Sequence, residues 1–256
     1  MSIDEKQVQG THSSQAARQG WDIYDEFEGP NLDASLWQPA DFGSGPRLEP
    51  EARTTVEDGA LTVDVQRFSN CDPNNQGLDN TKHLVISTKG FAIPADGARR
   101  FSVDLHAENF DASGDYRHGF ATLTLVDFTT HTVLGIFSTG DRVFAEQEIL
   151  ESPGQEHPFT RVVEDPFFAS RAGLTPGPGY VRCEIEIDRT HGQITYRIDD
   201  RVLHVAAGVT GLPEEVHMAF GMFTLLPVEE GSSCRGQGGR ASWRNFQSSA
   251  PPEDSA

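Results

Sequence analysis

The feature that most constrains this chain is a two-residue alternation of apolar and polar side chains, repeated in many short runs. Residues 101–108, with the sequence FSVDLHAE, alternate throughout, and residues 183–188, with the sequence CEIEID, do the same. Successive side chains of a β-strand point to opposite faces, so this period is typical of strands with one buried face. We therefore predict that Cys183, Ile185 and Ile187 point inward, and we find no pattern of a long amphipathic helix.

Turn residues divide the predicted strands at short intervals. The pair Asp58-Gly59 precedes one strand, and the pair Asp199-Asp200 separates two others. The predicted strands cover residues 60–65, 83–87, 101–108, 119–127, 133–138, 141–149, 183–188, 194–198, 202–205, 216–225 and 241–247. Many short strands with almost no helix predict an all-β sandwich or barrel.

The length of 256 residues fits one large β-sandwich, since such domains run to about 200–250 residues. We predict one domain over residues 21–247, a polar disordered tail over residues 1–20 and a second tail over residues 248–256. Residues 153–178 are irregular and rich in proline, and a long loop of this kind in a compact domain is often functional.

The chain carries a formal net charge of −19, from 39 acidic and 20 basic residues. A negative surface repels phosphate backbones and anionic lipids, so we expect neither nucleic acid nor a membrane as a partner. Residues 1–20 are polar, which predicts no signal peptide, and no apolar run is long enough to span a bilayer. We therefore expect a cytoplasmic protein with a small-molecule substrate.

The cysteines and histidines predict neither a disulfide framework nor a metal site. We expect free, buried thiols, with one disulfide as the open alternative, among Cys71, Cys183 and Cys234. Four histidines lack the spacing of metal ligands, and we expect them on the surface or as caps: His83, His118, His131 and His157. We expect no cofactor.

Three segments resemble the laminarinase-like and concanavalin A-like superfamily. Residues 25–37 (DEFEGPNLDASLW) are similar to the opening strand and loop of family-sixteen glucanases, where an acidic-Phe pair precedes Leu-Asp and then Trp. Residues 183–205 resemble the superfamily hairpin around an Asp turn, and residues 241–246 (ASWRNF) resemble its final strand. The resemblance implies a concanavalin A-like jelly-roll β-sandwich of two antiparallel sheets. It also suits a structural calcium in acidic loops such as residues 22–28, although no ligand spacing there supports one.

A closer resemblance is to a poorly characterised actinobacterial family whose members often lie beside natural-product gene clusters. It is carried by residues 125–128 (LVDF), 139–144 (TGDRVF) and 236–243 (GQGGRASW). The resemblance implies a metabolic role rather than polysaccharide degradation.

The sharpest candidate site is residues 146–151 (EQEILE), whose spacing is similar to the glucanase motif Glu-x-Asp-x-x-Glu. Residues two apart on a strand share a face, so Glu146 and Glu148 are predicted to point together into the concave groove. Glu151 joins them if a β-bulge shifts the register before it. The resemblance implies Glu146 as nucleophile and Glu151 as acid/base. Gln147 and Glu148 depart from the motif, and no Trp lies near it, so a solvated acidic strand face is favoured over hydrolysis.

A second hypothesis keeps the groove and changes the chemistry. A lining of mixed polar and apolar side chains suits a small organic ligand. The lining is predicted to include Asp104, His106, His118, Asp127, Arg142, Phe144, Glu146 and Glu148. A carboxylate or histidine there is expected to act as general base in a cyclisation, elimination or isomerisation. Each residue alone also fits a solvated strand position.

Three functions follow from these patterns. The leading hypothesis is an enzyme of specialised metabolism that binds a small organic, polyketide-like substrate in the groove. The alternatives are a glycoside hydrolase or lyase that uses Glu146, Glu148 and Glu151, and a non-catalytic carbohydrate- or ligand-binding module.

Overall fold

The computed structural model describes residues 20–41, 45–69, 81–110, 118–140, 142–149, 160–164, 179–224, 228–229, 232–233 and 237–249. This part of the chain is built almost entirely from β-strands. Within it, no helix has the length and apolar character needed to cross a membrane.

The strands form two large antiparallel sheets. Sheet A has the order β14 (Arg201–Ala207), β13 (Gln193–Ile198), β12 (Val181–Asp188), β7 (Ala98–Phe110), β18 (Gly238–Ser249), β4 (Ala60–Val65) and β3 (Ala52–Glu57), and β1 (Trp21–Asp25) also pairs with β18. Sheet B has the order β11 (Thr160–Glu164), β10 (Val143–Ile149), β9 (Thr132–Ser138), β8 (Phe120–Asp127), β15 (Glu215–Thr224), β5 (Thr81–Ser87) and β2 (Trp37–Pro39), and β6 (Phe91–Ala92) also pairs with β15. A separate hairpin joins β16 (Val228–Glu229) to β17 (Ser232–Ser233).

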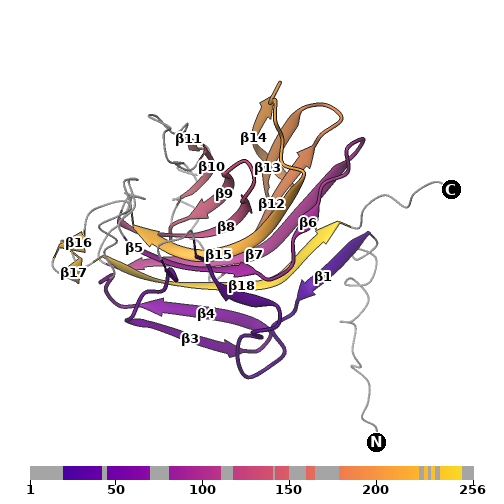
Figure 1. Cartoon of the computed structure of the whole chain (residues 1–256). Coiled ribbons are helices and arrows are strands. Elements are labelled where there is room, and N and C mark those ends of the chain that lie inside the picture. The colour runs from indigo at the N-terminus through magenta and orange to yellow at the C-terminus, as the bar shows by residue number, and fades with distance from the viewer. Residues whose placement is uncertain are drawn as a thin grey trace, which may run out of the picture.

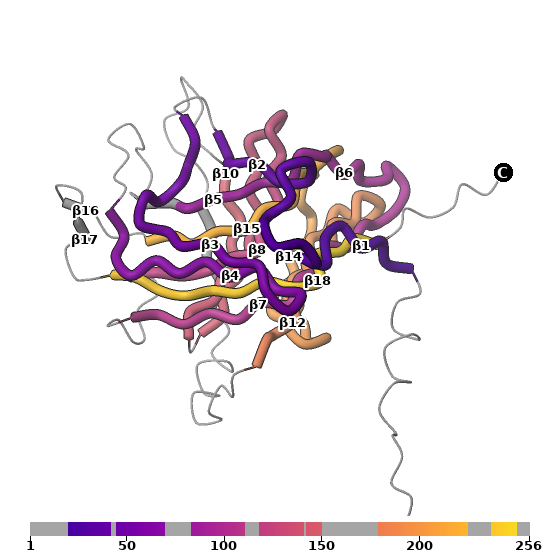
Figure 2. Tube along the Cα trace, turned by 90° about the horizontal axis from the view of Figure 1, so that it is seen from below, coloured from indigo at the N-terminus to yellow at the C-terminus, as the bar shows by residue number. Residues whose placement is uncertain are grey.

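The two sheets pack face to face as a sandwich. Strand β8 packs against β7, β9 against β12, and β10 against β14. Figure 1 shows sheet A curving from β3 at the bottom of the view to β14 at the upper right, with the middle strands of sheet B inside this curve. Seen from below, strands β3, β4, β18 and β7 of sheet A cross the molecule side by side (Figure 2). The face of sheet B that points away from sheet A is therefore the concave side of the molecule.

The apolar side chains on the inward face of each strand fill the space between the sheets. The predicted inward residues Cys183, Ile185 and Ile187 are all fully buried, which confirms the alternation. Trp243 lies at the centre, where its ring nitrogen donates a 3.0 Å hydrogen bond to the Thr122 carbonyl of the other sheet. This bond ties β18 to β8, because a buried indole N–H needs an acceptor.

The jelly-roll sandwich predicted from the sequence is confirmed, and most of the predicted strands are present within a few residues of their expected ends. The chain also forms strands that the patterns did not predict. Strand β3 has one buried apolar side chain, Val56, because it is an edge strand, so its alternation is weak. Strand β11 lies inside residues 153–178, which the sequence predicted to be irregular. Strand β18 continues through Ser248 and Ser249, which were assigned to the C-terminal tail.

The structure agrees with the predictions for some of the cysteines and histidines and differs for others. Cys183 is a free, buried thiol as expected, and burial raises its pKa. Cys71 and Cys234 lie outside the described residues.

His131 is exposed in the turn after β8, as expected. His83 was expected on the surface or as a cap and is instead 6% exposed, because β5 turns it toward sheet A.

Candidate functional site

Two outward faces carry the polar side chains of the sandwich. In β8, Ala121, Leu123 and Leu125 lie in the core, so the alternate residues and their cross-strand partners form the outer face of sheet B. This face consists of Phe144, Glu146 and Glu148 on β10, Val133, Gly135 and Phe137 on β9, Thr122, Thr124 and Val126 on β8, and His217 and Ala219 on β15. The outer face of sheet A consists of Ser102, Asp104 and His106 on β7, Arg182, Glu184 and Glu186 on β12, Arg197 on β13 and Arg244 on β18.

Glu146 and Glu148 share the concave outer face of sheet B, as the alternation predicted. Their strand neighbours Val143 and Ala145 are buried between the sheets. The backbone carbonyl of Glu146 accepts a 3.0 Å hydrogen bond from the Tyr196 hydroxyl, which reaches up from sheet A. This bond connects the strand that carries the two carboxylates to the core.

A glycine makes room for the Glu146 carboxylate. Gly135 is the cross-strand partner of Glu146 on β9. A methyl group at position 135 would lie 3.3 Å from Oε2 of Glu146 and 3.7 Å from Oγ1 of Thr122. The carboxylate therefore leans across β9 into the space that the missing side chain leaves, toward the Thr122 hydroxyl.

A row of aromatic rings borders the carboxylates on one side. Phe144 stacks on Phe137 with ring centroids 5.0 Å apart, and Phe137 contacts Phe120 at 4.5 Å. Phe120 in turn contacts Phe223 at 5.3 Å. All four rings are buried. They give Glu146 an apolar neighbour on this face.

His217 and Phe128 lie farther across this face, with His217 three strands from Glu148, and the sequence patterns did not single them out. The row of cross-strand partners Glu148, Val133, Val126 and His217 crosses the outer face of sheet B. Nδ1 of His217 lies 2.8 Å from the Ser87 carbonyl and so donates to it, which leaves Nε2 as the acceptor in the neutral ring. Phe128 is 44% exposed, and its ring lies edge-on to His217 at 5.3 Å. In the sequence, the position of His217 between the core residues Val216 and Met218 was the signal that could have placed its side chain on the outer face.

The structure does not bring Asp104 and His106 to this site, so the hypothesis of one groove lined by both sets of residues is wrong. Both residues lie on the outer face of sheet A, with the whole sandwich between them and Glu146. Asp104 accepts a 2.7 Å hydrogen bond from Asn245 and lies 3.4 Å from the Arg244 guanidinium. Alternation assigns a side chain to one face of its strand, but it does not say which sheet the strand joins.

Of the remaining predicted residues, Asp127 and Arg142 form hydrogen bonds in turns. Asp127 is 4% exposed and caps the turn after β8, where it accepts hydrogen bonds from the Thr129 amide (2.7 Å) and the Thr130 hydroxyl (2.6 Å). The backbone amide of Arg142 donates a 3.0 Å hydrogen bond to the Thr139 hydroxyl in the turn before β10. His118 lies two residues before β8, and Glu151 lies outside the described residues.

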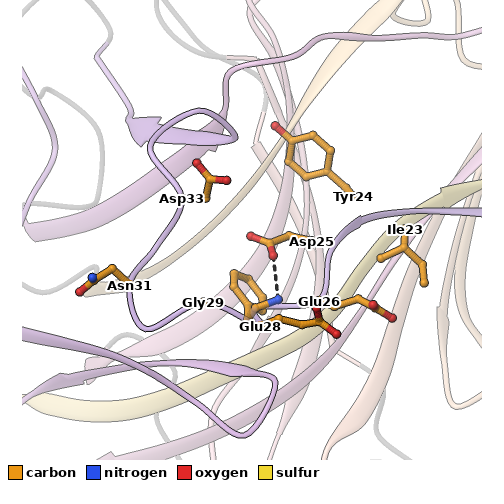
Figure 3. Close-up of a pocket in the computed structure, with 9 residues that line it drawn as sticks. Ile23, Tyr24, Asp25, Glu26, Glu28, Gly29, Asn31 and Asp33 are labelled. Atoms are coloured by element: carbon orange, nitrogen blue, oxygen red, sulfur yellow. Dashed lines mark hydrogen bonds between the residues drawn. The ribbon is translucent and has the colours of Figure 1, made fainter.

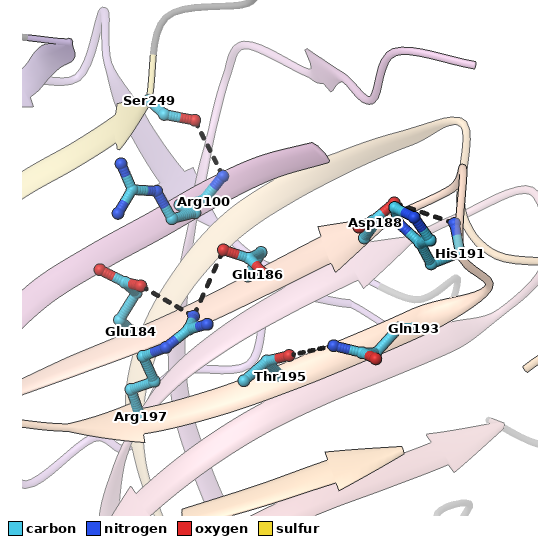
Figure 4. A network of polar contacts seen from close by, with 9 residues as sticks. All are labelled: Arg100, Glu184, Glu186, Asp188, His191, Gln193, Thr195, Arg197 and Ser249. Carbon is cyan, nitrogen blue, oxygen red and sulfur yellow. Dashed lines mark hydrogen bonds and ion pairs between the residues drawn. The ribbon is translucent and has the colours of Figure 1, made fainter. Parts of the chain in front are cut away.

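The polar side chains on the outer face of sheet A form ion pairs and hydrogen bonds with one another (Figure 4). The Arg197 guanidinium contacts Glu184 at 3.1 Å and Glu186 at 3.3 Å. Burial raises the pKa of Glu184, and the positive charges of Arg100 and Arg197 oppose this rise. Asp188 pairs with His191 at 2.7 Å. The positive charge of Arg197 thus offsets the charges of Glu184 and Glu186, as in ion pairs with a structural role.

An acidic pocket of about 430 Å³ follows β1, around residues 23–33 (Figure 3). Both oxygens of Asp25 are engaged there, one by the Phe27 amide and one by the Trp37 ring nitrogen, each at 2.7 Å. Asp33 accepts from the amide and the hydroxyl of Ser35. Across the part of the chain that the structure describes, no three His, Cys, Asp or Glu side chains are placed to hold one metal ion. In this loop the carboxylates of Asp25 and Asp33 are engaged by hydrogen-bond donors of the chain, and the structural calcium that the superfamily suggests stays a prediction.

None of the tryptophans lies on the outer face of sheet B. Trp37 and Trp243 are 2% and 0% exposed in the core. Trp21 lies on β1 of sheet A, with the Arg100 guanidinium 4.8 Å from its ring. The aromatic surface near Glu146 and Glu148 is therefore made by phenylalanine.

Several solved structures with the same fold are glucanases. An endo-1,3-β-glucanase from Streptomyces sioyaensis is 14% identical, with a TM-score of 0.57 over 91% of this chain and 98% of its own. An endo-1,3-β-glucanase (laminarinase) catalytic domain from Thermotoga petrophila is 12% identical, with a TM-score of 0.56 over 91% and 99%. A β-glucanase from Bacillus licheniformis is 14% identical, with a TM-score of 0.51 over 90% and 97%. At these identities the likeness shows the fold, which is the concanavalin A-like jelly roll.

No curated protein matches this chain in sequence. A family model does match it, over residues 24–251, which include every strand of both sheets from β2 to β18. The chain therefore belongs to the family described as "Family of unknown function (DUF6081)".

Proposed function

We propose that this chain is a glycoside hydrolase that acts on a β-linked glucan through the carboxylates of β10. The observation that carries the proposal is that Glu146 and Glu148 project together from β10 onto the concave outer face of sheet B. The fold is shared with endo-1,3-β-glucanases, which supports this activity over the small organic substrate that led the sequence hypotheses.

Glycoside hydrolysis uses a pair of carboxyl groups, and β10 carries Glu146 and Glu148 on one face. Two carboxyl groups stand about 5–5.5 Å apart in retaining glycosidases and about 6.5–9.5 Å apart in inverting ones. Glu146 and Glu148 lie two residues apart on β10, about 6.6 Å along the strand, so a second carboxylate stands beside the proposed nucleophile. The buried rings of Phe144 and Phe137 lie beside Glu146 and give this part of the face an apolar surface.

In the proposed reaction, the Glu146 carboxylate forms a bond to the anomeric carbon while a second carboxylic acid protonates the departing glycosidic oxygen. The motif spacing assigns that acid to Glu151, with Glu148 between the two. Water, deprotonated by Glu151, then displaces Glu146 and releases the sugar with its configuration retained. The reaction needs no group other than these side chains and water.

The test is hydrolysis of laminarin, a β-1,3-glucan, followed as release of reducing ends. We expect Glu146→Gln to lower the rate about 10³-fold, because the amide cannot act as the nucleophile. Glu186→Gln is the matched control: it makes the same change on a strand of sheet A, on the opposite side of the sandwich, and is expected to leave the rate within about twofold. Equal rates for both variants, or no cleavage of any β-glucan by the unaltered chain, would contradict the proposal.

A second candidate function is acid–base chemistry on a small organic substrate at the same carboxylates. The row of four phenylalanine rings beside Glu146, together with the lack of tryptophan on this face, favours it. Thermal stabilisation by two panels separates the candidates: oligosaccharides for the first, aromatic polyketide-like molecules for the second. A saturating ligand, at one hundred times its Kd, stabilises the fold by about 2.7 kcal/mol. Stabilisation by sugars that survives Glu146→Gln without any turnover would identify a binding module instead.

A further inference from the structure

A second pocket lies at the far edge of the sandwich from β10, where the two sheets part. It is bounded by β3 of sheet A and by β2 and β5 of sheet B, and its volume is about 360 Å³. Its lining is mainly apolar, with Leu32, Trp37, Leu48, Val56 and Val85 among its walls. Ligand pockets typically measure about 300–1,000 Å³ and are lined in this way, with few polar groups.

One buried polar ring lines this pocket. His83 is 6% exposed, on the same side of β5 as Val85. Its Nδ1 accepts a 3.2 Å hydrogen bond from the Glu49 amide, so the proton of the neutral ring resides on Nε2. Burial lowers the pKa of His83 to about 4, which keeps the ring neutral near pH 7. The donor of this ring, Nε2, therefore belongs to a residue that lines the pocket.

Glu49 and its hydrogen bonds hold the His83 imidazole in place. Glu49 is 3% exposed, and its carboxylate accepts hydrogen bonds from the Ser69 amide (2.9 Å) and the Ser69 hydroxyl. The carboxylate is therefore used to fix the loop, while the amide of the same residue fixes the imidazole. The donor at Nε2 is thereby oriented before any ligand arrives, and an oriented donor costs little to use.

We propose that this pocket binds a small, uncharged molecule with an apolar body and one carbonyl or ether oxygen, which accepts a hydrogen bond from Nε2 of His83. A neutral donor in an apolar pocket selects an uncharged acceptor, because a charged group would lose its hydration without gaining an opposite charge. The site is separate from the proposed catalytic face. In sheet B, β5 and β10 are four strand spacings apart, about 19 Å, and His83 faces the interior of the sandwich whereas Glu146 faces away from it.

The test compares 2-acetylnaphthalene with 2-ethylnaphthalene, two probes that share an apolar body and differ in the carbonyl. Binding is followed by titration of the ring signals of His83 in nuclear magnetic resonance spectra and by thermal stabilisation. We expect the ketone to bind about fivefold more tightly than the hydrocarbon, which is the contribution of one neutral hydrogen bond. In His83→Phe the two probes are expected to bind equally.

A second pair of variants tests the location without touching the histidine. Thr54 is an exposed wall of the pocket, and Thr55, its neighbour on β3, points to the opposite face. We expect Thr54→Phe to abolish binding of both probes and Thr55→Phe to leave it within twofold. Equal affinity for the two probes in the unaltered chain, absence of binding, or binding that survives Thr54→Phe would overturn the proposal. Because none of these variants alters β10, the outcome is independent of laminarin hydrolysis.

Discussion

The two outward faces of the sandwich carry similar carboxylates in opposite electrostatic settings. Strands β7, β12, β13 and β18 of sheet A contain Arg99, Arg100, Arg182, Arg197, Arg240 and Arg244. Strands β8, β9, β10 and β15 of sheet B contain neither lysine nor arginine. Glu184 and Glu186 are accordingly held in ion pairs with Arg197, whereas Glu146 and Glu148 lie among threonine, glycine and phenylalanine.

This difference indicates where chemistry is possible. A carboxylate held by an arginine remains ionised and is poorly suited to give or take a proton, because the cation favours the charged form. Strands β8, β9 and β15, which cross the same face as Glu146 and Glu148, hold no arginine or lysine that would favour the charged form of a carboxyl group. The absence of arginine from the central strands of sheet B therefore supports the choice of the concave face as the site.

The largest expected effect comes from placing a cation on the concave face. Val133 is the cross-strand partner of Glu148, and the long side chain in Val133→Arg reaches the carboxylate. We expect a loss of about 10²-fold in laminarin hydrolysis, since the arginine stabilises the ionised form. Val133→Met is the control for size and is expected to lose less than about threefold. Similar losses in the two variants would mean that bulk, and not charge, decides activity here.

A smaller effect is expected when the cation is removed from sheet A. Arg197→Met leaves Glu184, which is 7% exposed, without its ion pair and should lower the free energy of unfolding by about 2 kcal/mol near pH 7. The loss should shrink as the pH falls toward 4. A carboxyl whose pKa is raised in the folded state binds protons more readily there than in the unfolded chain, so acid favours folding.

Urea denaturation at several pH values measures this effect. The double variant Arg197→Met with Glu184→Gln should recover part of the lost stability at pH 7, because no buried charge remains. Laminarin hydrolysis should remain unchanged throughout. A pH-independent loss would show that Arg197 acts through the packing of its aliphatic chain.

The smallest effect is expected at the glycine beside the candidate nucleophile. In Gly135→Ala the new methyl group lies 3.3 Å from Oε2 of Glu146, a contact that the flexible carboxylate relieves by turning away. We expect about a tenfold loss of hydrolysis with less than about 1 kcal/mol change in stability, because only the carboxylate position shifts. Unchanged activity would mean that hydrolysis does not depend on the position of the Glu146 carboxylate beside Gly135.

Several features of the site were predictable from sequence, and others were not. The shared face of Glu146 and Glu148 follows from their two-residue spacing alone. The separation of Asp104 and His106 from them does not, because β7 joins sheet A through contacts with β12 and β18, which lie far along the chain. Strand β11 was missed because it pairs only with β10 at the edge of sheet B and needs no clear apolar face.

The sequence by itself determined that the chain forms many short strands, which side chains share a face within each strand, and that the result is an all-β sandwich. These properties depend on neighbouring residues, through the fixed alternation of the extended backbone. Only the tertiary structure decided which strands lie together, which face is concave, and that His83 is buried at the edge between the sheets. These depend on pairings between distant segments, and identical alternation in two strands is compatible with either sheet.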